Sequence, residues 1–238
     1  MSYVDKLTKK LLPHYTPPEG TGGHDDTHVL RMIGMHPTLQ PYIDEPVKQE
    51  LYETTVLLHN IDRAPCFTES IKVRGLASVL EELLGSSPFE FSDQRLVVDA
   101  IVNHSKFKDD PNDSALMQML RLADKWDRLS VIGMTSGIAW LGCQRQLYDP
   151  ESPFGFGSTA EGKGGWQTLY QNFFRILEWY AVFPKIRLLV DEYPERFMAA
   201  IAFVRAFGAE IAATHNIPNK VEDDLNKVFG EYYVRFKP

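Results

Sequence analysis

Apolar residues recur at spacings of three and four in segment after segment of this chain, whereas the strict alternation of a half-buried strand is almost absent. A spacing of three and four places side chains on one face of a helix. The pattern therefore predicts an all-helical fold. The 238 residues suit a single domain, because a chain of this length buries about 70 to 75% of its unfolded surface.

Capping residues and prolines, taken together with this periodicity, give the expected helices. They cover residues 26 to 36, 46 to 59, 70 to 84, 92 to 104, 113 to 127, 166 to 182, 185 to 191, 194 to 214 and 218 to 229. Pro37 is expected to stop the first of these helices, and Gly85 the third. Ser92 is expected to cap the fourth, with Phe91 packed onto Leu96 as a hydrophobic staple.

The composition is that of an ordinary globular protein. Hydrophobic residues make up 44% and charged residues 24% of the chain, with a formal net charge of -7. A protein that binds a nucleic-acid backbone is usually basic, so nucleic acid is not expected as a partner. No apolar run approaches the roughly 18 residues of a membrane span, so membrane association is not expected either. Homo-oligomerisation is left open.

Three further features bear on location and organisation. Cys66 and Cys143 are far apart and outside any C-x-x-C spacing, which fits a reducing, cytoplasmic setting. Residues 1 to 10 lack the apolar core of about 7 to 15 residues that a signal peptide needs. Residues 149 to 165, rich in Gly, Ser and Pro, are expected to form a flexible loop that acts as a lid or a connector, followed by C-terminal helices over residues 166 to 238.

Histidines and aspartates gather in three short patches that lie far apart in the sequence. The patches are Gly23-His24-Asp25-Asp26-Thr27-His28, Leu57-Leu58-His59-Asn60-Ile61-Asp62 and Leu122-Ala123-Asp124-Lys125-Trp126-Asp127. Imidazole nitrogen and carboxylate oxygen are ligands that borderline divalent cations take. Asp124 and Asp127 also continue the apolar stripe of their helix, and a buried carboxylate is costly unless it is paired or binds a cation. The patches therefore indicate a metal site.

The order of these motifs resembles the H…HD…D signature of the HD-domain superfamily of metal-dependent phosphohydrolases. Further segments are similar to those of its small single-domain hydrolase branch. They are His24-Asp25-x-x-His28, Ile101-Val102-Asn103-His104-Ser105, Ile132-Gly133 with Ser136-Gly137-Ile138-Ala139, Phe174 to Leu177 and Arg196 to Glu210. The resemblance covers most of the chain and implies a single helical bundle of the HD type, residues 1 to 238, with a metal-site core at about residues 20 to 140.

The resemblance implies a ligand set for one divalent ion, with Mn, Fe, Ni, Zn, Co and Mg not distinguished. The set consists of His28, His59, the residue at position 60, and Asp124. Water activated by this ion would attack the phosphorus of a nucleotide or another small phosphate ester. His104 would take part in catalysis, or bind a second ion or a substrate phosphate. The alternative for His104 is a buried ring that donates to a carbonyl.

Four further side chains are candidates for the reaction or for substrate binding. Arg31 and Arg63 are positioned to clamp phosphate oxygens, although an exposed helix arginine is the commoner case. Lys125 is a candidate catalytic group because it follows Asp124 directly. Asp127 is expected to take part in the reaction by orienting a ligand histidine or by holding substrate.

Position 60 departs from the family pattern, which has Asp where this chain has Asn. Two neutral imidazoles and two carboxylates balance a divalent ion, whereas a single carboxylate leaves a net charge of about +1. Weaker metal retention and a poorer general base beside the water are therefore expected. Asp62 is expected to compensate only if the helix ends at His59.

Three functions from different classes follow. The first is a metal-dependent phosphohydrolase that acts on a small phosphorylated substrate. The second is a degenerate HD protein that binds a metal or a phosphorylated ligand without turnover, as a sensor or regulatory module. The third is a structural all-helical protein whose histidines are buried for packing. Because function depends on the site and not on the fold, the geometry of the patches decides among them.

Overall fold

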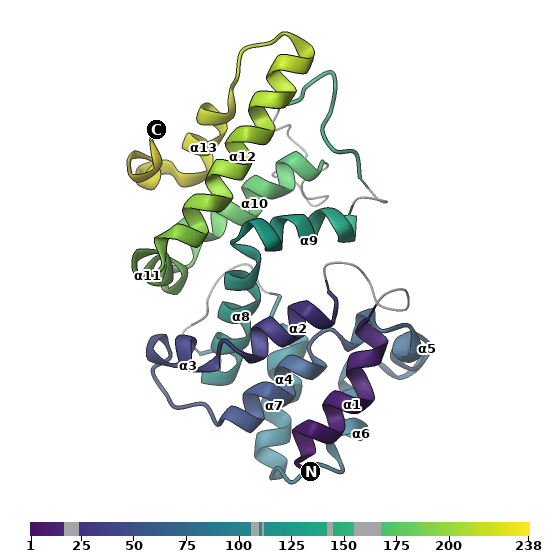
Figure 1. Ribbon diagram of the computed structural model, residues 1–238. Coiled ribbons are helices and arrows are strands. Elements are labelled where there is room, and N and C mark those ends of the chain that lie inside the picture. The colour runs from purple at the N-terminus through teal and green to yellow at the C-terminus, as the bar shows by residue number, and fades with distance from the viewer. Residues whose placement is uncertain (17–23, 106–109, 111, 142–144, 155–167) are drawn as a thin grey trace. The chain divides into compact units, whose positions relative to one another are not determined.

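The computed structural model describes residues 1–16, 24–105, 110, 112–141, 145–154 and 168–238. Every regular element in this part of the chain is helical, so the all-helical prediction is confirmed (Figure 1). The chain divides into two compact units, Met1–Asp127 and Arg128–Pro238. The N-terminal unit ends inside the metal-site core predicted at residues 20 to 140, and the single-domain prediction stays a prediction.

The N-terminal unit consists of short helices, with α8 reaching its C-terminal border. These helices are α1 (Tyr3–Tyr15), α2 (Asp26–Ile33), α3 (His36–Leu39), η1 (Gln40–Tyr42), α4 (Gln49–Leu58), η2 (Ile61–Arg63), α5 (Pro65–Arg74), α6 (Leu76–Leu84), α7 (Phe91–Asn103) and α8 (Ala115–Arg128). The boundaries of α4 and α8 agree with the predicted helices to within three residues. No helix was expected over α1, which begins with a capping box between Ser2 and Asp5.

The central helix of this unit is α4. It is buried along nearly its whole length, from Leu51 to Leu58, and it contacts α1, α2 and α7 (Figure 1). A helix that is buried on all sides needs packing partners around it, and these three helices supply them. His59 and Asn60 follow α4 directly and are 2% and 4% exposed. The packing of α4 therefore fixes the backbone of both residues inside the unit.

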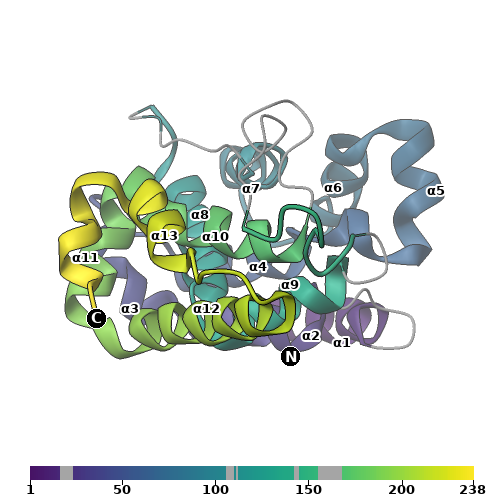
Figure 2. The ribbon, with the colours of Figure 1, turned by 90° about the horizontal axis from the view of Figure 1, so that it is seen from above.

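Two helix boundaries in this unit differ from the predictions. The helix expected at residues 26 to 36 already ends at Ile33, and Pro37 lies in the first turn of the next helix, where its missing N–H is no loss. The helix expected at residues 70 to 84 is interrupted at Gly75, whose φ of 83° favours glycine. The interruption produces two helices, α5 and α6, that lie side by side (Figure 2).

The predicted N-terminus of α7 is wrong. The helix already begins at Phe91, so Ser92 lies within its first turn and Glu90 is the cap residue. Phe91 is 75% exposed and Leu96 is 38% exposed, which excludes the predicted staple between them. A staple needs the apolar residue before the cap, and Phe91 lies one position after it. The residues of α7 that are buried are Val97, Ala100 and Ile101.

The C-terminal unit is also helical. Its elements are α9 (Val131–Leu141), α10 (Leu169–Val182), α11 (Pro184–Glu192), α12 (Pro194–His215), α13 (Val221–Phe229) and η3 (Gly230–Phe236). The helices from α10 to α13 agree with the predicted ones to within three residues, whereas α9 was not expected from periodicity. Of the predicted loop at 149 to 165, residues 155 to 165 lie outside the described residues, as does Cys143.

An aromatic cluster forms the core of this unit. Ring centroids of Tyr180, Phe197, Phe229 and Phe236 lie 4.7 to 5.9 Å apart, in edge-to-face, tilted and stacked pairs. Such pairs stabilise a core beyond the area they bury. They join α10, α12, α13 and η3.

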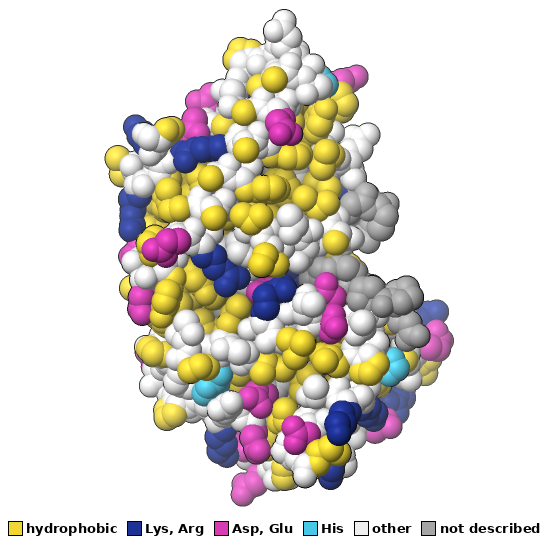
Figure 3. All heavy atoms as spheres, in the orientation of Figure 1, with side chains coloured by type: hydrophobic (Ala, Val, Ile, Leu, Met, Phe, Trp, Pro, Cys, Tyr) yellow, Lys and Arg dark blue, Asp and Glu magenta, His cyan; other side chains and the backbone are white. Residues whose placement is uncertain are grey.

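The longest helix, α12, is also the most relevant to the membrane prediction. An 18-residue window of it has a mean hydropathy of 1.5 and is 39% buried, so by length and composition alone this helix is able to cross a membrane. Apolar side chains cover much of the surface over α12 in Figure 3. On its other side α12 contributes Phe197, Ile201 and Val204 to the core of the unit. The absence of membrane association therefore stays a prediction.

One buried carboxyl in this unit makes stability depend on pH. Asp224 on α13 is 4% exposed, and its Oδ2 atom has no hydrogen-bond partner among the described residues. Burial raises the pKa of Asp224 from its ordinary value of 3.8 to about 7, against the opposing effect of Lys227 and Lys220. Between these two values the folded protein binds a proton that the unfolded chain has lost. The contribution of Asp224 to stability is therefore fully present below about pH 4 and lost as the pH rises through about 7.

We expect Asp224→Asn to raise the melting temperature at about pH 8 by roughly 5 °C relative to the unchanged protein, because it removes a buried charge. At about pH 4 the two proteins should melt within about 1 °C of each other, since both side chains are then neutral. Thermal denaturation followed by circular dichroism measures both. The matched control is Asp223→Asn on the exposed neighbour. If the control variant shifted in the same way, surface charge and not burial would explain the effect.

Candidate metal centre

Three helices of the N-terminal unit bring His28, His59 and Asp124 together. His28 lies in α2, His59 caps the C-terminus of α4, and Asp124 lies in α8. One ligand atom from each side chain falls within 4.8 Å of the other two. The two histidines are buried and Asp124 is partly exposed. These residues were predicted as ligands from the three sequence patches, and the structure places them in one group.

The N-terminus of α2 fixes the position of His28. Asp25 is the N-cap residue, and its Oδ1 atom accepts hydrogen bonds from the His28 backbone N–H at 3.0 Å and from the Thr27 hydroxyl at 2.7 Å. A cap of this kind holds the first turn of a helix. The ring of His28 is 1% exposed, and that of His24 lies 6.0 Å from it between centroids. Asp25 therefore holds both the first turn of α2 and the backbone of His28 in place.

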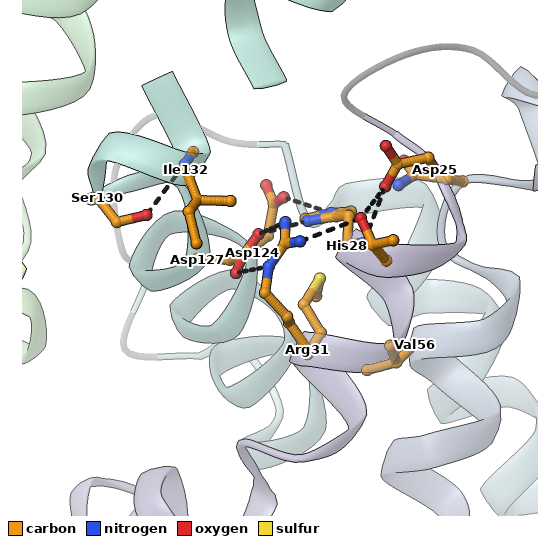
Figure 4. A network of polar contacts seen from close by, with 12 residues as sticks. Asp25, His28, Arg31, Val56, Asp124, Asp127, Ser130 and Ile132 are labelled. Carbon is orange, nitrogen blue, oxygen red and sulfur yellow. Dashed lines mark hydrogen bonds and ion pairs between the residues drawn. The ribbon is translucent and has the colours of Figure 1, made fainter. Parts of the chain in front are cut away.

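Asp127 contacts the Nδ1 side of the His28 ring and links His28 to Arg31 (Figure 4). The Nδ1 atom of His28 is 2.8 Å from the Oδ2 atom of Asp127. Arg31 donates to both carboxylate oxygens of Asp127, from Nε and from Nη2, each at 2.9 Å. Since a carboxylate can only accept here, the His28 ring carries a proton on Nδ1, and Nε2 is the nitrogen that could bind a metal. An aspartate that supports a ligand histidine is the expected second layer of a metal site.

These contacts keep Asp127 ionised. Burial alone would raise the pKa of Asp127, but the hydrogen bonds from Arg31 and His28 outweigh it and hold the pKa well below its ordinary range. Arg31 also donates from Nη1 to the hydroxyl of Thr27 at 3.1 Å. Arg31 thus contacts Asp127 and Thr27, and through Asp127 it helps to hold the ring of His28. Its predicted role as a phosphate clamp stays a prediction.

The other two histidine rings are fixed in the same way. The Nδ1 atom of His59 is 2.6 Å from the Val56 carbonyl, and that of His104 is 2.6 Å from the Ile101 carbonyl. A carbonyl only accepts, so both rings carry their proton on Nδ1. The ring centroid of His59 lies 5.4 Å from that of His28 and 5.7 Å from that of His104. His104 therefore lies beside the group. Its ring donates to a carbonyl, as in the predicted alternative, but it is half-buried and not buried.

His59 is held in its neutral form. Burial, with a smaller contribution from the neighbouring rings of His28 and His104, lowers the pKa of His59 from 6.5 to about 3 against the attraction of Asp124. A neutral imidazole is the form that ligates a metal.

Asn60 contacts the Nε2 atom of His59, which is the nitrogen that could bind a metal. Its Nδ2 atom lies 2.7 Å from the Nε2 atom of His59. Because that nitrogen carries a lone pair, the amide N–H of Asn60 donates to it. Asp62, considered as a substitute ligand, pairs with Arg63 at 3.2 Å instead, although α4 does end before His59.

The remaining predicted site residues are placed as follows. Lys125 is 4% exposed in α8, next to Asp124. The Arg63 side chain is 41% exposed, and its guanidinium pairs with Asp62. The roles predicted for both in the reaction stay predictions.

The sequence interpretation missed one residue, Arg121. This side chain is 1% exposed, pairs with Asp113 at 2.8 Å, and donates to the backbone carbonyl of His104 at 3.3 Å. It lies one turn before Asp124 in α8 and so connects that helix to the end of α7. A charged residue within the apolar stripe of α8 was the available signal.

The donor set fits a borderline divalent cation such as Zn, Mn, Fe or Ni. It offers the Nε2 atoms of two imidazole rings and one carboxylate. Each ring carries its proton on Nδ1, where it donates to the protein. Ligand atoms about 2.1 Å from one ion lie about 3 to 4 Å apart, so the group needs only a small contraction to close around it.

Comparison with known proteins gives the fold alone. No family model matches the chain, and no curated protein matches it. Among solved structures, a Lactobacillus plantarum protein determined as a Northeast Structural Genomics target superposes with a TM-score of 0.65 at 19% sequence identity. The match covers 89% of this chain and 97% of that one.

Proposed function

We propose that this protein is a metal-dependent phosphohydrolase that acts on a nucleotide or another small phosphate ester. The observation that carries the proposal is the group of His28, His59 and Asp124, with Asp127 bonded to the far nitrogen of His28. The resemblance of the three patches to the HD-domain superfamily supports it. A divalent ion in this group supplies an activated water and neutralises charge on a phosphoryl oxygen.

The side chains around the group have separate tasks in this proposal. Asp127 and Arg31 hold the His28 ring in the orientation that a ligand needs. His104 donates from its Nδ1 atom to a carbonyl, and in the neutral ring this leaves the Nε2 atom to accept a proton or a hydrogen bond from substrate. Asp124 is the partly exposed member of the group, so in this proposal solvent and substrate would reach the ion from its side.

A second candidate function is a module that binds a metal or a phosphorylated ligand without turnover. Asn60 favours it, because a neutral amide stands where a second carboxylate would both hold the ion and act as a base. The two functions share a metal site and differ only in turnover.

We expect purified protein incubated with Mn or Ni and then desalted to retain about one equivalent of metal per chain, measured by elemental analysis. With metal it should hydrolyse at least one member of a panel of nucleotides and nitrophenyl phosphate esters. Chelation should remove the activity and fresh metal should restore it. Metal without hydrolysis of any ester would favour the second function. Absence of metal after both incubations would contradict both.

A further inference from the structure

Asn60 differs from a carboxylate in two ways that matter for the ligand group. It is 4% exposed, and its amide N–H donates to the nitrogen of His59 that would otherwise be a ligand, at 2.7 Å. An aspartate at this position would carry a negative charge and no donor. The amide of Asn60 therefore lacks the negative charge of an aspartate, and its N–H group also occupies the Nε2 atom of His59.

The charges around the group can be counted from the contacts. Asp127 is balanced by Arg31, which donates to both of its oxygens. The ring of His59 counts as neutral, because its Nδ1 atom donates to the Val56 carbonyl and its Nε2 atom accepts from Asn60. The remaining charge among the proposed ligands is that of Asp124. A divalent ion placed here would keep a net charge of about +1 in a largely buried site.

We propose that this site takes a divalent cation together with an anion of the phosphate class, each increasing the affinity for the other. The inference rests on the metal site of the proposed function and adds how that site is regulated. The phosphate oxygen supplies the negative charge that Asn60 does not. Since coupling between two ligands is reciprocal, each tightens the other by the same factor, on the order of tenfold or more.

Titration calorimetry with Mn in the presence and absence of inorganic phosphate tests this proposal, and it does not depend on turnover. The unchanged protein should bind Mn at least about tenfold more tightly when phosphate is saturating. Asn60→Asp should bind Mn tightly without phosphate and lose most of the coupling, because it carries its own charge. The control is Asn226→Asp, which adds the same charge at an exposed position of α13 in the C-terminal unit. It should behave like the unchanged protein.

The outcomes separate this inference from the proposed function. Equal Mn affinity with and without phosphate would overturn the coupling and leave the metal site standing. The same coupling in Asn60→Asp as in the unchanged protein would overturn the role of Asn60. Failure of the unchanged protein to bind Mn under either condition would overturn the proposed function itself. Circular dichroism of each variant confirms that it is folded.

Discussion

His59→Ala is expected to reduce metal affinity by on the order of a hundredfold or more, and to abolish any metal-dependent hydrolysis with it. The reason is that His59 supplies one of the two imidazole ligands from a fully buried position, with its ring already fixed by the Val56 carbonyl. Alanine offers no ligand atom, and the cavity that it leaves is enclosed by α4 and its neighbours. Calorimetry with Mn measures the affinity, and a nitrophenyl ester reports the activity.

The matched control for this variant is His36→Ala. His36 also contacts a backbone carbonyl, that of Val47 at 2.8 Å, and packs on the ring of Tyr52, but it is not a member of the ligand group. It should keep the metal affinity of the unchanged protein. An equal loss in both variants would show that damage to the fold, and not loss of a ligand, is responsible. Full retention of metal by His59→Ala would remove His59 from the ligand set.

Asp127→Asn is expected to weaken metal binding by about 10- to 100-fold and to destabilise the protein by about 3 kcal/mol. Asp127 is 1% exposed and accepts from both His28 and Arg31, so its loss leaves the guanidinium without a buried counter-charge. The cost is at the lower end for a broken buried pair because Arg31 is 28% exposed and keeps some contact with water. Calorimetry measures the first effect. Thermal denaturation measures the second, as a fall of about 6 to 12 °C.

The control for Asp127→Asn is Asp93→Asn, which removes the acidic partner of an ion pair with Lys48. The Lys48 side chain is 73% exposed and Asp93 is 19% exposed, so the loss of this pair should lower the melting temperature far less than the loss of Asp127 and should leave the metal affinity nearly unchanged. If Asp127→Asn lowered stability without changing metal affinity, Asp127 would be a structural residue only. Loss of affinity in both variants would point to a general electrostatic effect.

The elements of the fold that were predictable are those with a sustained apolar stripe. The stripe of α8 predicted that Asp124 and Asp127 lie in line, and the helix confirms it. Single residues that act through backbone conformation were less predictable. Pro37 was expected to end a helix and instead lies in the first turn of one, and Gly75 was not expected to divide a helix. Proline and glycine mark a boundary without saying on which side the helix lies.

The residues of the candidate site were predictable from the sequence, but the hydrogen bonds that connect them to their neighbours were not. The three sequence patches pointed to His28, His59 and Asp124, and the structure brings them together with the two histidines buried and Asp124 partly exposed. The sequence does not say which partner a long side chain chooses. Arg31 is bonded to Asp127, and Arg121 bonds to the carbonyl of His104. Such choices depend on distances between helices that only the folded chain defines.

The fixed Nδ1 atoms of the three rings have a kinetic consequence. His28, His59 and His104 are each held by an acceptor on the protein before any ligand arrives. Little side-chain freedom remains to be lost on binding, so the site is preorganised. Apart from the small contraction of the ligand group and the turn of the Asn60 amide away from His59, no rearrangement should limit the capture of a metal. The rate at which ions enter is then set mainly by how fast each ion sheds its own water, and ions that exchange water slowly should load slowly.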